Sequence, residues 1–199
     1  KKEIGFTFAN ALHSILRQDP DIVMIGEIRD KETAEIAVEA ALTGHQVLST
    51  MHCNDAPGAV ARLDDMGIAP FLISSSVILA CAQRLMRRIC SHCKEPVTYP
   101  AKMFADLNFD PAEFKDVTLY RGRGCDRCKN SGYAGRLAII EAMTVTDEIR
   151  KLIIVRANAQ DIGHTAVGQG MRTLRMVALD RAREGVSTLE QVLVLTMAH

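Results

Sequence analysis

Between residues 7 and 66 the sequence alternates between two kinds of hydrophobic pattern, and this alternation limits the possible fold more than any other feature. In three segments the apolar residues recur every three or four positions, as on one face of an α-helix. Two short apolar runs between them have the length of strands. The expected order is helix 7–18, strand 22–25, helix 31–43, strand 46–50 and a helix from Asp55 to Met66. Such alternation is typical of an α/β protein with a parallel, doubly wound sheet.

Capping and turn residues mark the ends of these elements. Asp19-Pro20 stops the first helix, Gly44 closes the second, and Asp55 is a natural N-cap for the third. Strand 22–25 is entirely apolar, which is typical of a strand buried in a parallel sheet. Because the pattern is already under way at residue 1, we expect the first strands and helices of this sheet to lie upstream.

Beyond residue 67 the pattern becomes less regular. We expect a long helix over about 71–88, with Cys81 buried on its apolar face beside Val77 and Leu85. Residues 89–136 are rich in glycine, proline and cysteine and predict little regular structure except a helix at 101–107. The remaining elements expected are a strand at 137–140 and helices at 146–156, 161–167, 172–184 and 188–196.

Composition excludes two classes of protein. With 48% hydrophobic and 24% charged residues the chain is globular and not disordered. The longest uncharged run, 67–83, is shorter than the roughly 20 apolar residues of a spanning helix and contains Pro70. The chain starts at Lys1 and not at a methionine, so we expect a piece of a longer protein, and no secretory signal follows. Six cysteines without a signal peptide favour reduced thiols or metal ligands in the cytoplasm.

Charge is unevenly distributed although the net charge is zero. Residues 1–83 contain 6 basic and 11 acidic side chains, residues 84–136 contain 11 and 6, and residues 137–199 contain 7 and 7. The middle segment therefore carries a net +5. A basic segment of this kind permits binding to nucleic acid or to an acidic protein surface.

The strand at 22–25 runs into Gly26-Glu27, which places a carboxylate where open α/β sheets bind ligands. This position suggests nucleotide chemistry, which requires a phosphate-binding loop of the form G-x-x-x-x-G-K-[ST]. The only glycine pair with the right spacing is Gly163 and Gly168, and Gln169 follows it in place of lysine. Either the loop lies upstream of residue 1, or Glu27 is a structural acid that caps a helix or is simply solvated.

Four of the cysteines form the pattern CxxC-x31-CxxC, with pairs at Cys90 and Cys93 and at Cys125 and Cys128. Two such pairs supply the four thiolates of a closed, tetrahedral structural zinc site. The alternatives are redox-active CxxC motifs or incidental thiols, and His92 could replace one ligand. Cys53 has no partner by spacing.

Four stretches resemble the ATPases that power type II secretion and type IV pilus assembly. LRQDPDIVMIGEIRD (16–30) is similar to the signature that contains the Walker B acid of that family, and TGHQVLSTMHCNDA (43–56) to its histidine box. ACAQRLMRRIC (80–90) and MRTLRMVALDRAREGVSTLEQVLVLT (171–196) also resemble family segments. Two departures are His13, where an arginine is common, and Cys53, where threonine is more usual.

The resemblance implies the C-terminal part of a RecA-like parallel-sheet ATPase domain, with an inserted tetracysteine zinc subdomain and a C-terminal helical segment. The expected divisions are a partial ATPase core at 1–88, the zinc-binding subdomain at 89–136 and the helical segment at 137–199. On this basis the chain begins downstream of the Walker A loop. The fragment alone should then be inactive.

The resemblance also implies roles for individual residues. Glu27 takes the place of the Walker B acid and would orient the attacking water, and His52 would sense the γ-phosphate, although a lone histidine is more often structural. Arg29, Asp30 and His45 would lie near the nucleotide. For Arg29 and Asp30 an ordinary surface ion pair is an equal alternative, and His45 could simply finish its helix.

The implied function is hydrolysis of ATP with Mg²⁺ by a cytoplasmic homo-hexamer at the inner face of the bacterial inner membrane. Its partner would be the platform protein of a secretion or pilus machine. The alternative is a zinc-ribbon-type module that binds nucleic acid or protein through the basic segment. Only Tyr120 and Tyr133 stand near the basic cluster at 121–129, and the chain has no Trp, so specific nucleic-acid binding is not expected.

Overall fold

The computed structural model describes residues 8–106, 109 and 111–196, and these form two compact units. The first unit consists of Lys1–Cys81 and Ala142–Met171, and the second of Ala82–Glu141 and Arg172–His199. Each unit therefore combines two stretches of chain. The three divisions predicted along the sequence, 1–88, 89–136 and 137–199, stay a prediction.

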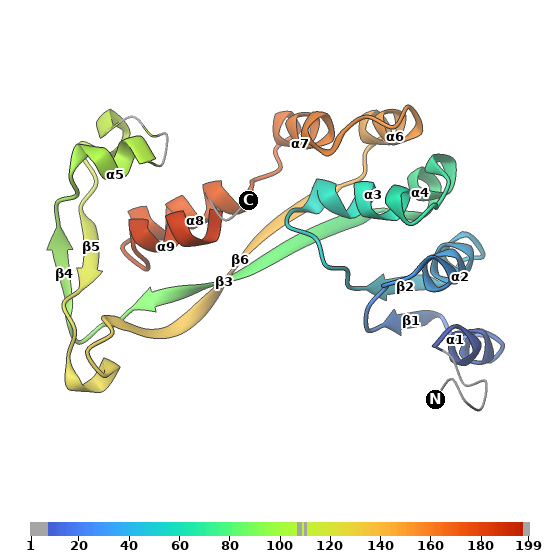
Figure 1. Ribbon diagram of the computed structural model, residues 1–199, viewed down its shortest axis with the longest axis horizontal. Helices are drawn as coiled ribbons and strands as arrows, with labels where there is room; N and C mark the ends of the chain where they lie inside the picture. Colours follow the sequence, from blue (N-terminus) through green and yellow to red (C-terminus); the bar gives the residue numbers. More distant parts are fainter. Residues whose placement is uncertain (1–7, 107–108, 110, 197–199) are drawn as a thin grey trace. The chain divides into compact units, whose positions relative to one another are not determined.

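The first unit is built from two parallel strands and six helices of the described chain (Figure 1). Its elements are α1 (Phe8–Leu16), β1 (Ile22–Ile25), α2 (Lys31–Leu42), β2 (Gln46–Ser49), α3 (Ala56–Asp65), α4 (Pro70–Ser76), α6 (Asp147–Ile154) and α7 (Ala159–Gly168). The strands pair in parallel from Ile22 with Gln46 to Ile25 with Ser49. The predicted α/β class is therefore confirmed. The predicted start of the first helix at Thr7 lies outside the described residues.

Two of these helices, α2 and α3, begin at aspartates that accept hydrogen bonds from their first turns. Asp30 accepts from the Thr33 amide at 2.9 Å and so caps α2, while Asp55 accepts from the Gly58 amide at 2.7 Å and caps α3. Caps of this kind contribute about 1 kcal/mol each. Gly44, with a φ of +104°, permits the turn that leads from α2 into β2.

The strand predicted to be buried is buried on one face only. Val23 and Ile25 lie in the core, whereas Ile22 is 61% and Met24 75% exposed. A strand buried on both faces needs helices on both sides of its sheet. In the described residues the helices cover only the face that carries Val23 and Ile25, so the expectation of a fully buried strand was wrong.

The long helix predicted over 71–88 is also wrong. The chain forms the short helix α4 and then the strand β3 (Leu79–Ile89), in which Ala80, Ala82 and Met86 are buried. Apolar residues four positions apart, such as Cys81 and Leu85, fit a strand as well as a helix, because four is an even number of residues. Both side chains are exposed, so Cys81 is not the buried residue that was expected.

The second unit combines two long strands, β3 and β6, with shorter elements and with two helices near the end of the chain. Besides β3 it contains β4 (Lys94–Val97), α5 (Ala101–Asp106), η2 (Pro111–Phe114), β5 (Leu119–Gly122), η3 (Asp126–Cys128), β6 (Tyr133–Thr144), α8 (Leu174–Arg183) and α9 (Leu189–Thr196). β4 and β5 pair antiparallel, and β3 pairs with β6. The boundary between the units falls within β3 and β6. The strand expected at 137–140 is the middle of β6, and position 107 of the helix expected at 101–107 lies outside the described residues.

The core of the second unit joins β3 and β6 to α8 and α9. Met86, Ile139, Leu189 and Val192 are fully buried in it. The buried carboxylate of Glu141 accepts a hydrogen bond from the Leu174 amide at 3.0 Å, at the N-terminus of α8, where a negative charge is favourable. This contact fixes the start of α8 against β6.

In the described residues no helix is long and apolar enough to span a membrane.

Candidate functional site

Two side chains meet at the edge of the sheet where β1 and β2 end. Glu27 follows β1, His52 follows β2, and parallel strands bring their C-terminal ends to one edge. His52 Nε2 lies 3.3 Å from Glu27 Oε2. Both side chains are accessible to solvent, His52 at 87%, so a ligand could reach them. The structure thus brings the two predicted catalytic residues together.

Thr50 ties the two chain segments together beyond the last strand pair. Its hydroxyl donates to the Gly26 carbonyl oxygen at 2.6 Å, and its own carbonyl oxygen accepts from the Ile28 amide at 2.9 Å. These bonds lie on either side of Glu27. The backbone at Glu27 is therefore held against β2 although both strands have ended.

Arg29 lies against the same carboxylate. Its Nε donates to Glu27 Oε2 at 2.5 Å. This hydrogen bond, together with the charges of Arg29 and His52, holds the pKa of the Glu27 carboxyl below its usual range and outweighs the effect of desolvation, which raises it. Glu27 is therefore ionised at neutral pH. The arrangement leaves a carboxylate with two nitrogen donors at the rim of the sheet.

Asp30 and His45 make contacts other than with Glu27. The Asp30 carboxylate caps α2, as described above. His45 Nδ1 lies 3.0 Å from the Ala40 carbonyl oxygen and 3.2 Å from Thr43 Oγ1, at the C-terminal end of α2. Because His45 precedes β2, it lies at the opposite edge of the sheet from Glu27. The expectation that His45 lies near a nucleotide stays a prediction.

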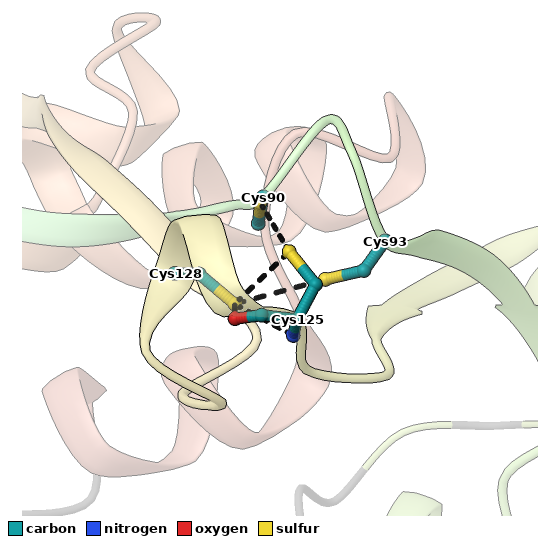
Figure 2. Close-up of side chains that lie close together, drawn as sticks. All are labelled: Cys90, Cys93, Cys125 and Cys128. Atoms are coloured by element: carbon teal, nitrogen blue, oxygen red, sulfur yellow. Dashed lines mark hydrogen bonds between the residues drawn. The ribbon is translucent and has the colours of Figure 1, made fainter.

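The four cysteines of the CxxC pairs form one cluster in the second unit. Figure 2 shows their side chains converging from the loop between β3 and β4 and from η3. Their four sulfur atoms lie within 4.8 Å of one another, and three sulfur pairs are separated by 3.7 to 3.9 Å: Cys90 and Cys125, Cys93 and Cys128, and Cys125 and Cys128. Four sulfurs at about 2.3 Å from a tetrahedral zinc ion lie about 3.8 Å apart. The predicted proximity is confirmed, and its spacing fits zinc.

Backbone amides point at two of the sulfurs. The amides of Cys125 and Gly132 donate to Cys128 Sγ at 3.2 and 3.3 Å, and the amide of Gly124 donates to Cys93 Sγ at 3.3 Å. Burial acts to raise the pKa of the Cys128 thiol, but these donors lower it to about 6. Burial raises the pKa of Cys93 to about 12, and hydrogen bonding with the neighbouring cysteine side chains adds to this rise. Donors of this kind stabilise thiolates, the form that binds metal.

The loops around the cluster need glycine at one close approach. A Cβ on Gly122 would lie 1.9 Å from the Gly132 carbonyl oxygen, so no other residue fits there without a backbone shift. His92 is exposed and its ring lies against Arg127, with Nη1 2.7 Å from Nε2, so it is not part of the four-sulfur group. Cys53 is also outside this group.

Sequence reasoning did not single out Thr50 or the amide–sulfur bonds. Thr50 stands two positions before His52, at the end of the strand expected at 46–50, and this position was the available signal. The amide–sulfur bonds depend on loop geometry that composition does not predict.

The fold is that of part of several solved ATPases. The chain superposes on the pilus retraction motor PilT with bound ADP, with a TM-score of 0.65 and 24% identity, over 96% of this chain and 43% of PilT. The Legionella pneumophila ATPase DotB gives a TM-score of 0.64 and 20% identity, over 97% of this chain and 43% of DotB. At this level of identity the likeness establishes the α/β fold alone. The tetracysteine cluster and the C-terminal helices are described from the structure of this chain.

Sequence comparison identifies the family. The model of the family described as "Type II/IV secretion system protein" matches residues 1–194, and the chain belongs to that family. Among curated relatives, the type IV pilus assembly ATPase PilB of Thermus thermophilus is 50% identical over 195 residues, 98% of this chain and 22% of that protein. The type II secretion system ATPase E of Vibrio cholerae is 48% identical over 193 residues, 97% of this chain and 38% of that protein. The chain therefore spans well under half the length of these relatives.

Proposed function

We propose that this chain is the C-terminal part of a motor ATPase that hydrolyses ATP to drive assembly of a type IV pilus or a type II secretion pseudopilus. The observation that carries the proposal is the convergence of Glu27 and His52 at the carboxyl edge of two parallel strands, 3.3 Å apart. The names of the curated relatives support it, since they are pilus assembly and secretion ATPases.

The main alternative for Glu27 was a structural acid that caps a helix. The N-cap of α2 is Asp30, three residues after Glu27, so Glu27 is not needed as a helix cap. The partners of Glu27 are instead the exposed side chains of Arg29 and His52. Exposed ion pairs contribute little to stability, so a purely structural role explains the arrangement poorly.

In the proposed reaction the ionised Glu27 accepts a hydrogen bond from the attacking water and orients it toward the γ-phosphate. When bound with ATP, Mg²⁺ would neutralise the negative charge of the phosphates. His52, held at the same edge, responds to the γ-phosphate and couples the nucleotide state to movement of the segment after β2. Arg29 can exchange its carboxylate partner for a phosphate oxygen, because both form charge-assisted hydrogen bonds with a guanidinium. Asp30 supports the same loop by capping α2, and His45 has no role in this proposal.

We propose structural Zn²⁺ as the ligand of the tetracysteine cluster. The sulfur spacing and the amide donors fit a closed site, and zinc bound by four thiolates has no open position for catalysis. The role is then to hold the short strands β4 and β5 and the loops around them, which contain little apolar side chain of their own.

The proposed assembly is a homo-hexamer at the cytoplasmic face of the bacterial inner membrane, in contact with the platform protein of the machine. A nucleic-acid-binding role for the basic segment is not favoured. Bases stack on exposed aromatic faces. The ring of Tyr120 is covered by Lys94 at 4.1 Å and that of Tyr133 by Arg87 at 4.5 Å, and Arg121 pairs with Glu95.

The proposal is tested by Glu27→Gln in the intact ATPase that contains this chain. The amide keeps the shape of the side chain and removes its charge, so we expect turnover to fall by about 10²–10⁴ while ATP still binds. His52→Ala should also lower turnover, with binding largely kept. Glu35→Gln is the matched control, because Glu35 is an exposed acid on α2 that pairs with Lys31 and should be dispensable for turnover.

A structural acid gives a different result. If Glu27→Gln lowers the melting temperature but leaves the rate per folded molecule within a few-fold of the unmodified enzyme, the catalytic assignment of Glu27 is wrong. Steady-state hydrolysis and nucleotide affinity, measured on the same preparations, separate the two cases.

A further inference from the structure

Thr50 contacts the backbone on both sides of Glu27. Its hydroxyl donates to the Gly26 carbonyl oxygen at 2.6 Å, and its carbonyl oxygen accepts from the Ile28 amide at 2.9 Å. The first of these groups belongs to the peptide plane that precedes the Glu27 Cα, and the second to the plane that follows it. Because φ and ψ are the only soft torsions of a residue, anchoring both planes fixes the backbone at Glu27.

The anchor is needed because the strand ladder stops short of the site. The last pair in the register is Ile25 with Ser49, and Glu27 lies two residues beyond it. Its side-chain partners, Arg29 and His52, are both strongly exposed and cannot hold the carboxylate rigidly. The two Thr50 bonds thus extend the sheet to the reacting position.

Thr50 also connects Glu27 to the segment that carries His52. It lies two residues before His52 on the same chain segment, directly after β2. Thr50 thus links the chain segment that carries His52 to the backbone of Glu27. Gly26 has open space where a side chain would stand, so its own surroundings do not fix this position.

We propose that Thr50 is a positioning residue, whose hydroxyl sets the orientation of the Glu27 carboxylate relative to His52 and to the attacking water. The inference rests on the proposed catalytic role of Glu27. A group that orients water must be held to within a fraction of an ångström, since a small misplacement can lower a rate by about 10²-fold. Thr50 does not itself touch the reacting atoms.

The test uses Thr50→Val and Thr50→Ser in the intact ATPase. Valine keeps the branched shape without the hydroxyl, so we expect kcat to fall by about 10–10²-fold while KM for ATP changes by less than about threefold. Serine keeps the hydroxyl and should restore kcat to within about threefold of the unmodified enzyme. Thr165→Val is the matched control, because the Thr165 hydroxyl donates to the Asp161 carbonyl oxygen at 3.0 Å within α7, away from the site.

A second measurement separates positioning from stability. If Thr50 acts through Glu27, Thr50→Val should change kcat by less than about twofold in a Glu27→Gln background, because the two effects are not additive. Additive losses of kcat in the double variant would overturn the inference. So would a Thr50→Ser variant with a kcat as low as that of Thr50→Val, or a Thr50→Val variant with the same kcat as the Thr165→Val control. If the valine variant does not fold, Thr50→Ala replaces it. Normal turnover in Glu27→Gln alone would instead overturn the catalytic role of Glu27, so the two failures are distinguishable.

Discussion

At the scale of single residues, the edge of the β1–β2 sheet combines one carboxylate with two nitrogen donors. Hydrogen bonding to Arg29, and the charges of Arg29 and His52, favour the ionised form of Glu27. A carboxyl whose pKa is lowered on folding stabilises the folded state above its ordinary pKa. That contribution is lost as the pH falls through the lowered value. The charge of Glu27 is thus secured throughout the neutral range.

This arrangement predicts the effect of Arg29→Ala on the titration of Glu27. Removing the guanidinium removes the strongest interaction that lowers the pKa, so the pKa of Glu27 should rise toward that of an ordinary glutamate. The midpoint can be measured by NMR titration of the labelled carboxyl carbon. Lys31→Ala is the control, since Lys31 pairs with Glu35 and not with Glu27. The assignment of the Arg29 contact would be contradicted if the titration midpoint of Glu27 were the same in the unmodified protein, Arg29→Ala and Lys31→Ala.

The sequence was sufficient to place Glu27 and His52 at one edge, because each follows a short apolar strand and the strands are parallel. The same reasoning places His45, which precedes β2, at the other edge. That His45 lies near a nucleotide stays a prediction. Thr50 could not be found in this way, since its hydroxyl bond to Gly26 depends on how the two chains continue beyond the last strand pair.

At the scale of secondary-structure elements, prediction succeeded where caps and periodicity agreed and failed where one spacing fitted two structures. α2 and α3 begin at capping aspartates and were located correctly. The segment 79–89 has apolar residues spaced by two and four, which a strand and a helix both satisfy. Only pairing with β6, more than forty residues later in the sequence, decides for the strand, and local patterns contain no information on that pairing.

The loops of the tetracysteine cluster depend on long-range contacts in the same way. The pair Cys90 and Cys93 meets the pair Cys125 and Cys128 only because β4 and β5 pair and the backbones of Gly122 and Gly132 approach closely. The spacing of the cysteines predicted the cluster, and the glycines make its geometry possible.

We predict one zinc ion per chain at this cluster. Zinc bound by four thiolates contributes its binding free energy to folding, so chelation should unfold the segment around β4 and β5. Metal analysis of protein purified without added zinc, followed by circular dichroism during chelation, measures both. Cys125→Ser should lower the zinc content, whereas Cys81→Ser, at an exposed cysteine outside the cluster, should not. Well-folded protein with a stoichiometry near zero would contradict the zinc assignment.

At the scale of the whole molecule, the two functional features belong to separate compact units. The Glu27 edge lies in the first unit and the tetracysteine cluster in the second. The chain runs from the first unit through the second, back to the first and again to the second, so four segments share two cores. Each core therefore depends on residues that lie far apart in the chain.

The last prediction concerns nucleotide binding by the 199-residue chain itself. Most of the affinity for a nucleoside triphosphate comes from backbone amides and a lysine that surround its phosphates. The printed sequence contains no G-x-x-x-x-G-K-[ST] motif, and its Gly163–Gly168 pair lies on α7, where the amides are occupied by helix bonds. Glu27 contributes negative charge, which repels phosphate in the absence of a metal ion. We therefore expect a Kd for Mg²⁺-ATP in the millimolar range or weaker, and no measurable hydrolysis.

Isothermal titration calorimetry of the chain with Mg²⁺-ATP measures this affinity, with the intact ATPase as the positive control. Glu27→Gln should not weaken binding by the isolated chain, because removing a negative charge near the phosphates cannot reduce their attraction. A micromolar Kd for the chain alone would mean that its own residues form the phosphate site. Binding of the nucleotide would then not depend on a phosphate loop from outside this sequence. The Glu27 edge would lose its proposed role.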